Sequence, residues 1–169
     1  MDLAFRPATP DDASGIAGLR RAVADDLTRR YGKGHWSFAG TEKSVLHDIQ
    51  TSSVVVAENT TRMIATLRLA SRKPWAIDTK YFRDCGTPLY LTTMAVDPGM
   101  QRRGIGRRCI GHARQIAGEW AANAIRLDAY DAPAGAGEFY VKCGFREVGR
   151  VSYRENPLVY LELMLSEST

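Results

Sequence analysis

One stretch in the second half of the chain, an apolar run that ends in a glycine-containing turn, constrains the fold most strongly. The run LYLTTMAV, residues 89–96, is rich in strand-forming residues and stops at Asp97-Pro98-Gly99. Gly104 and Gly106 follow, and apolar residues then recur at helical spacing. A strand that is apolar on both faces and leads through a turn into a helix predicts a mixed α/β domain around a central sheet.

The start of this helix carries an unusual concentration of positive charge. Four arginines flank the two glycines: Arg102, Arg103, Arg107 and Arg108. A helix N-terminus already exposes unpaired N–H groups and a partial positive charge, so arginine is electrostatically unfavourable there unless an anion is bound. Glycine has no Cβ and lets a bulky phosphate approach the backbone closely. The turn therefore predicts a site for a pyrophosphate-type anion, with a solvated helix start and chance arginines as the alternative.

Two common phosphate-binding motifs do not fit this turn. A dinucleotide fingerprint needs a third glycine where this chain has Cys109, and it follows the first strand, whereas this turn lies late in the chain. An ATP-binding P-loop needs Lys followed by Ser or Thr, and the turn has neither. Both ligand classes are disfavoured.

Length and charge narrow the class of protein further. The 169 residues predict a single domain, residues 1–169, that is long enough to bury a sizeable core. The net charge of +4 is compatible with an anionic ligand. The basic cluster is confined to one turn, without a basic stripe or interleaved aromatic residues, so we expect no nucleic-acid partner.

The cysteine content and the hydropathy pattern allow a prediction of where the protein is found in the cell. The chain has three cysteines, Cys85, Cys109 and Cys143, and no Cys-x-x-Cys spacing. We therefore expect neither a disulfide framework nor a metal site, and we predict a cytoplasmic protein. The first residues lack the apolar core of a secretory signal, and no apolar run is long enough to span a membrane.

Hydrophobic periodicity and turn residues predict the other elements. Strands are expected at residues 3–8, 53–59, 62–70, 124–130, 144–153 and 158–165. Helices are expected after Asp11 or Asp12, at 44–49, from about Gly104 to Trp120, and at 135–142. The predicted order is β-α-α-β-β-β-α-β-α-β-β, a mixed central β-sheet flanked by helices.

The glycine turn and three other segments of the chain resemble the motifs of a known family. Gln101-Arg102-Arg103-Gly104-Ile105-Gly106 resembles the Gln/Arg-x-x-Gly-x-Gly/Ala acyl-CoA motif of the GNAT superfamily of N-acetyltransferases. The preceding LTTMAVDP is similar to the family's fourth strand, FYVKCGF (139–145) to its Tyr-x-x-x-Gly-Phe element, and FRPATPDD to its opening strand and turn. The similarity covers nearly the whole chain, and the predicted order of elements is that of the family.

The resemblance implies an acetyl-CoA site between residues 89–96 and 124–130. The pantetheine arm would pair with the strand backbone and the pyrophosphate would lie on the glycine turn. The implied cofactor-binding residues are Met94, Ala95, Val96, Gln101, Arg102, Arg103, Gly104, Ile105, Gly106, Arg107 and Asp131. Asp131 departs from the pattern because many relatives carry Asn there, and an ionised carboxylate cannot donate a hydrogen bond.

The implied chemistry is attack of an amine on a thioester. Tyr140 matches the family's tyrosine near the sulfur, and a phenol is a suitable general acid for the departing thiolate. The alternative is that Tyr140 is only a packed aromatic residue. The general base stays open among Glu58, Asp128, Asp131, Glu138 and a water chain. An acyl-cysteine route is disfavoured, because Cys109 and Cys143 are expected in the core.

The acceptor is the least constrained part of the hypothesis. In relatives, the first two helices and the loop between them line the acceptor side of the site. In this chain that loop contains Tyr31, His35, Trp36 and Phe38, and the stretch after residue 70 adds Trp75 and Tyr81. If these residues are functional, they favour an amine with an apolar or cationic body, either a small molecule or a peptide. The protein could be a homodimer, and the acyl donor could be longer than acetyl. The main rival is a non-catalytic acyl-CoA-binding sensor.

Overall fold

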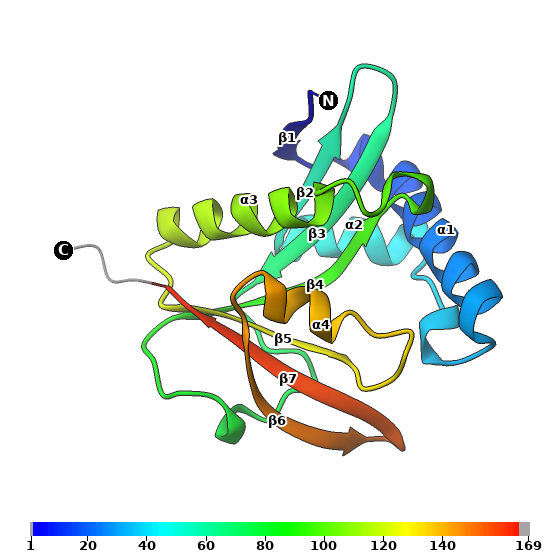
Figure 1. The fold of residues 1–169 in the computed structure, drawn as a ribbon. Helices are drawn as coiled ribbons and strands as arrows, with labels where there is room; N and C mark the ends of the chain where they lie inside the picture. The colour runs from blue at the N-terminus through cyan, green and yellow to red at the C-terminus, as the bar shows by residue number, and fades with distance from the viewer. Residues whose placement is uncertain (1, 166–169) are drawn as a thin grey trace. The chain divides into compact units, whose positions relative to one another are not determined.

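The computed structural model describes residues 2–165, and its order of helices and strands confirms the prediction (Figure 1). The strands are β1 (Ala4–Pro7), β2 (Ser53–Glu58), β3 (Met63–Ala70), β4 (Pro88–Val96), β5 (Ala124–Tyr130), β6 (Arg146–Tyr153) and β7 (Asn156–Met164). The helices are α1 (Ala13–Tyr31), α2 (Glu42–Thr51), α3 (Ile105–Glu119) and α4 (Gly137–Lys142). Short 3-10 turns lie at Pro10–Asp12, His35–Ser37, Thr79–Tyr81 and Pro98–Met100.

The strands form one mixed sheet, in the order β1-β2-β3-β4-β5-β7-β6. β1, β2 and β3 pair antiparallel, with the predicted hairpin between β2 and β3. β4 pairs parallel with β5, and β5, β7 and β6 pair antiparallel. The predicted mixed α/β class is therefore confirmed.

The chain divides into two compact units. Unit 1 holds the residues up to Ala70 together with Thr92–His112, and unit 2 holds Ser71–Leu91 and the residues from Ala113 onward. β4 and α3 each contribute residues to both units. The expectation of a single domain stays a prediction.

The core of unit 1 forms where α1 and α2 pack on β2. Its buried residues are Ala13, Ile16, Val45, Val54 and Val56. The helix predicted at 44–49 is present and starts two residues earlier, because Thr41 caps it by accepting a hydrogen bond from the Ser44 N–H. The helix expected after Asp11 or Asp12 is α1, which continues to Tyr31. It ends only where Gly32 adopts a positive φ of 83°.

The core of unit 2 forms between β5–β7 and the stretch that connects β3 to β4. Ile77 and Phe82 of this stretch pack with Tyr90 and Tyr160. On the same sheet face, Arg126 and Glu162 form a buried ion pair at 2.9 Å. The irregular segment predicted before β4 is therefore a cover for one face of the sheet.

The last residue of the helix predicted from about Gly104 to Trp120 is exposed. Trp120 continues the apolar spacing of α3, yet it lies one residue beyond the helix and is 45% exposed. The helix closes there because Ala121 takes a left-handed φ of 53° and the Ala122 N–H donates to the Ala117 carbonyl, as in a Schellman motif. Periodicity alone does not show where a helix stops.

Candidate active site

The turn between β4 and α3 is held rigidly within unit 1. The Asp97 carboxylate accepts a hydrogen bond from the Gly99 N–H at 2.8 Å and forms an ion pair with Arg62. The Asp97 N–H donates to the Ile64 carbonyl of β3 at 2.8 Å. The Gln101 side-chain amide donates to the Val96 carbonyl at 3.1 Å. Gln101, predicted to bind the cofactor, therefore uses its side chain to close the turn.

The start of α3 leaves backbone donors without helical partners. Its first intrahelical bond joins the Arg108 N–H to the Gly104 carbonyl at 3.2 Å, so the N–H groups of Ile105, Gly106 and Arg107 have no acceptor within the helix. Gly104 has a φ of +78°, and a Cβ built there would meet no atom within 4 Å. The Ile105 side chain is buried, which leaves its backbone for binding. These features fit an anion at the exposed face of the turn.

The arginines of the turn differ in their roles. Arg102, Arg103 and Arg107 are exposed and form no hydrogen bond or ion pair with other residues between 2 and 165. Arg108 instead donates to the Leu3 carbonyl at 3.3 Å. Three guanidinium groups beside an open helix start are therefore available to a phosphate-containing ligand.

The last part of β4 contains a backbone irregularity that the sequence did not reveal. Thr93, a β-branched residue, has a φ of 49° in the left-handed region, where such residues are rare. It directly precedes the predicted pantetheine-pairing residues Met94, Ala95 and Val96. The Ala95 side chain is buried, whereas Met94 and Val96 are partly exposed. The irregularity re-aims the backbone groups at the start of that segment.

Sequence reasoning also missed Arg20 of α1. It occupies a buried stripe with Ala13, Ile16 and Ala24, and it is only 9% exposed. Its guanidinium donates to Thr93 Oγ1 at 2.9 Å and to Asp48 Oδ2 at 3.3 Å. Burial lowers the pKa of Arg20 from its ordinary value. An arginine in the middle of an apolar stripe was the available signal.

Unit 2 places Tyr140 on α4, with its side chain mostly buried. Its ring meets Phe139 and Phe145 edge-on, at centroid distances of 5.2 and 5.5 Å. The Phe145 N–H donates to the Tyr140 carbonyl across Gly144, which has a φ of 99°. The Tyr-x-x-x-Gly-Phe element is thus a helix ending in a Schellman motif, and its hydrophobic contact orients Tyr140.

Asp131 lies just beyond β5 and has a charged partner. Its carboxylate accepts hydrogen bonds from Arg150 at 3.0 and 3.2 Å, and Arg150 also pairs with Glu147. Asp131 and Arg150 line a cavity of about 760 Å³ beside α4. The Asp131 carboxylate is therefore engaged in an ion pair, and a cofactor contact of Asp131 stays a prediction.

The four candidate bases have different environments. Glu58 pairs with Arg6 at 2.9 Å, which lowers its pKa, and Asp131 pairs with Arg150. Glu138 is exposed. The Asp128 side chain on β5 has no hydrogen bond or ion pair with any described residue, and desolvation raises its pKa. Asp128 is the one whose environment suits a proton acceptor at mild pH.

The cysteines are poor nucleophiles. Cys109 is fully buried, and burial raises its thiol pKa to about 11. Cys143 is also buried. The preference against an acyl-cysteine route is consistent with both environments.

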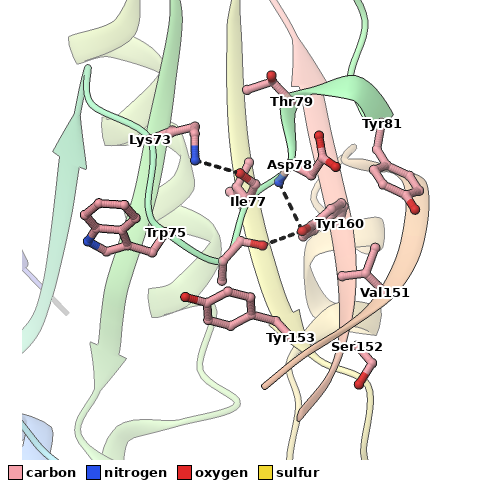
Figure 2. A pocket seen from close by; sticks show the side chains of 11 residues that line it. Lys73, Trp75, Ile77, Asp78, Thr79, Tyr81, Val151, Ser152, Tyr153 and Tyr160 are labelled. Carbon is pink, nitrogen blue, oxygen red and sulfur yellow. Dashed lines mark hydrogen bonds between the residues drawn. The ribbon is translucent and has the colours of Figure 1, made fainter. Parts of the chain in front are cut away.

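The aromatic residues considered for the acceptor fall into two groups. In unit 1, Phe38 is 79% exposed, while the Trp36 indole donates to the Gly32 carbonyl at 2.9 Å. In unit 2, Trp75 and Tyr81 line a cavity of about 500 Å³, together with Tyr153 and Tyr160 (Figure 2). The Tyr160 hydroxyl accepts from the Asp78 N–H and donates to the Ala76 carbonyl, which shapes one wall of this cavity (Figure 2).

Among residues 2–165, no group of three or more His, Cys, Asp and Glu side chains is placed to hold a metal ion. Within the same residues, no helix has the length and apolar character needed to cross a lipid bilayer.

The fold and the turn together define an acyltransferase. More narrowly, the family model described as "Acetyltransferase (GNAT) family" matches residues 20–145, and the chain belongs to this family. GNAT proteins use acetyl-CoA as their cosubstrate. No curated protein shows a significant sequence match.

Solved structures share the fold at low sequence identity. The ribosomal-protein-S18-alanine N-acetyltransferase from Escherichia coli is 15% identical with a TM-score of 0.72, over 99% of this chain and 97% of that chain. The yncA protein from Salmonella typhimurium, solved with its cofactor acetyl-CoA, is 16% identical with a TM-score of 0.71, over 100% and 97%. A GCN5-related N-acetyltransferase from Rhodopseudomonas palustris is 20% identical with a TM-score of 0.73, over 98% and 97%.

Proposed function

We propose that this protein transfers the acetyl group of acetyl-CoA to an amine by direct attack, without an acyl-enzyme. The start of α3 is the observation that carries the proposal. Three arginines that form no pair among residues 2–165, backbone N–H groups without an acceptor inside α3, and the open space at Gly104 fit the pyrophosphate of a coenzyme A ester. Bound acetyl-CoA would supply an activated thioester.

The proposed contacts divide between backbone and side chains. The backbone of Met94, Ala95 and Val96 would pair with the pantetheine arm as an added strand. The turn from Gln101 to Arg107 would hold the phosphates through its N–H groups and exposed guanidinium groups. Asp131 would act through its ion pair with Arg150, because a lone carboxylate cannot donate to a carbonyl.

Two residues of unit 2 suit the proton transfers. Asp128 is paired with Tyr160 in the sheet, on the face that residues 76–82 cover. Val159 and Leu161 belong to the other face, where they line the cavity beside α4, the helix that carries Tyr140. We assign Asp128 as the base that takes a proton from the attacking amine, and Tyr140 as the acid that protonates the departing thiolate. As the nitrogen bonds to the carbonyl carbon, the carbon–sulfur bond breaks, and afterwards Asp128 releases its proton to solvent while solvent reprotonates Tyr140.

The acceptor class follows from the family as an amine, either a small molecule or a peptide. One structural neighbour is named for an alanine of ribosomal protein S18 and another for an aminoglycoside. These names differ widely at similar fold likeness, so the fold does not select between them. The cytoplasmic location and the homodimer also stay predictions.

Calorimetric titration with acetyl-CoA, with NAD and ATP as controls, tests the proposal. We expect micromolar binding of acetyl-CoA and none of the controls, followed by release of free thiol with a panel of amines. Binding without thiol release from any amine would indicate an acyl-CoA sensor. Absence of acetyl-CoA binding would contradict the assignment of the turn and the enzyme function together.

A further inference from the structure

Two arginines of unit 1 share a single carboxylate. Arg20 on α1 lies 3.3 Å from an Asp48 oxygen, and Arg68 on β3 lies 3.5 Å from the other. The Arg20 side chain is 8% exposed and that of Arg68 is 23% exposed. The cluster therefore holds one positive charge in excess at a largely buried position, which is costly without a further anion.

The cluster also has more donors than acceptors. Each guanidinium has five N–H groups. Arg20 uses Asp48 and Thr93 as acceptors, and its Nε is buried without a partner. Arg68 donates to Ser52 Oγ at 2.7 Å and to Thr92 Oγ1 at 3.4 Å. Most of the remaining N–H groups lack an acceptor within the cluster, so both the charge and the hydrogen bonding call for another anion.

The hydroxyl groups of Thr92 and Thr93 add hydrogen-bond donors on the solvent-accessible side of the cluster. A hydroxyl oxygen that accepts a bond from a guanidinium keeps its own proton free to donate elsewhere. Thr93 is exposed and Thr92 is half-buried. An anion can therefore reach these hydroxyls and the Arg68 fork from solvent.

We propose that the cluster of Arg20, Arg68, Thr92 and Thr93 binds the carboxylate of the amine acceptor, which would make the acceptor a compound of the amino-acid type. A carboxylate matches the planar fork of arginine and brings the single negative charge that the cluster lacks, whereas a phosphate would bring nearly two. This inference rests on the proposed function, because it assigns a subsite for the second substrate. The cluster adjoins the segment proposed to pair with the cofactor, since Thr93 precedes Met94.

Matched pairs of acceptors test the inference on the full chain at saturating acetyl-CoA. Each of the twenty protein amino acids is compared with its carboxamide, which keeps the amine and the side chain but loses the negative charge. We expect kcat/KM from thiol release to favour the free acid at least tenfold for the preferred acceptor. Arg68→Gln and Thr92→Val should each reduce that preference, and Arg68→Lys should restore part of it.

Arg6, an arginine of unit 1 outside the cluster, provides the control. Arg6 is paired with Asp12 and Glu58 at the edge strand β1, so Arg6→Gln should keep the preference for the free acid. Carboxamides that react as well as free acids, or acetyl-CoA binding without turnover of any amino acid, would overturn this inference and leave cofactor binding standing. Failure to bind acetyl-CoA would instead remove the proposed function, and this inference with it.

Discussion

The Arg20 guanidinium lies 2.9 Å from Oγ1 of Thr93, a residue held in a left-handed conformation inside β4. A β-branched residue in that region costs on the order of 1–3 kcal/mol, which the surrounding structure must offset. Arg20 provides one such restraint from α1, and Asp48 holds Arg20 in turn. A residue on the first helix thus shapes the strand proposed to pair with the cofactor.

Removing the Arg20 charge should therefore affect stability strongly. We expect Arg20→Met to lower the free energy of unfolding by about 2 kcal/mol, because Thr93 loses its restraint and Asp48 keeps Arg68 alone, while removal of the excess positive charge offsets part of the loss. Thr93→Ser, which keeps the hydroxyl, should change it by less than about 1 kcal/mol. Urea denaturation measures both variants. Equal stabilities for the two would show that the contact does not restrain the strand.

Charge at the glycine turn should decide cofactor binding. We expect Gly104→Glu to abolish acetyl-CoA binding, because it adds bulk and negative charge at the proposed phosphate position. Gly104→Ala is the matched control, since both side chains share the cost of a φ of +78° and only one adds charge. Calorimetry measures the affinities and thermal melting confirms the fold. A glutamate variant that binds as well as the alanine variant would place the phosphates elsewhere.

The Tyr140 hydroxyl should act on turnover. We expect Tyr140→Phe to lower kcat by about 100-fold, the typical contribution of a general acid, while acetyl-CoA affinity stays within a factor of about three. The ring keeps its contacts with Phe139 and Phe145, so melting should change little. Steady-state kinetics and calorimetry separate the two effects. Parallel losses of turnover and affinity would mark Tyr140 as a packing residue.

The pH profile should report on Asp128. Its carboxylate must be ionised to accept a proton, and burial raises its pKa above the ordinary aspartate value. We therefore expect kcat/KM to fall as pH decreases through that raised pKa. Asp128→Asn should lower kcat/KM by about 100-fold or more and remove this limb.

Glu138, an exposed carboxylate of the same unit, supplies the comparison. Glu138→Gln should leave the acid limb of the profile unchanged. If Asp128→Asn keeps the wild-type profile, another group or a water chain removes the proton.

Local features of the chain were predicted well from sequence. The adjacent strands β2 and β3, the second helix and the passage from β4 through a glycine turn into α3 all appear close to their expected positions. Each depends on residues close together in the chain, whose spacing and turn preferences are visible in the sequence. The family resemblance was carried by such local motifs.

Glycines show the limit of that approach. Gly118 and Gly135 look equivalent in the sequence, yet a Cβ at Gly118 would meet nothing within 4 Å, whereas one at Gly135 would lie 1.8 Å from the Tyr130 carbonyl. Likewise, apolar spacing included Trp120 in the helix, although α3 ends at Glu119 and the chain turns away at Ala121. The space around a residue depends on which distant segments of the chain fold against it, and the spacing of residues in the sequence does not show this.

The sequence by itself determined the fold class, the order of elements and the family, and it predicted an anion site at the glycine turn. Only the tertiary structure distinguished the unpaired Asp128 from the paired Glu58 and Asp131, and only it brought Arg20 and Arg68 together with Thr93. The reason is physical: periodicity and turn chemistry act between neighbours, whereas desolvation and ion pairing depend on which distant side chains meet.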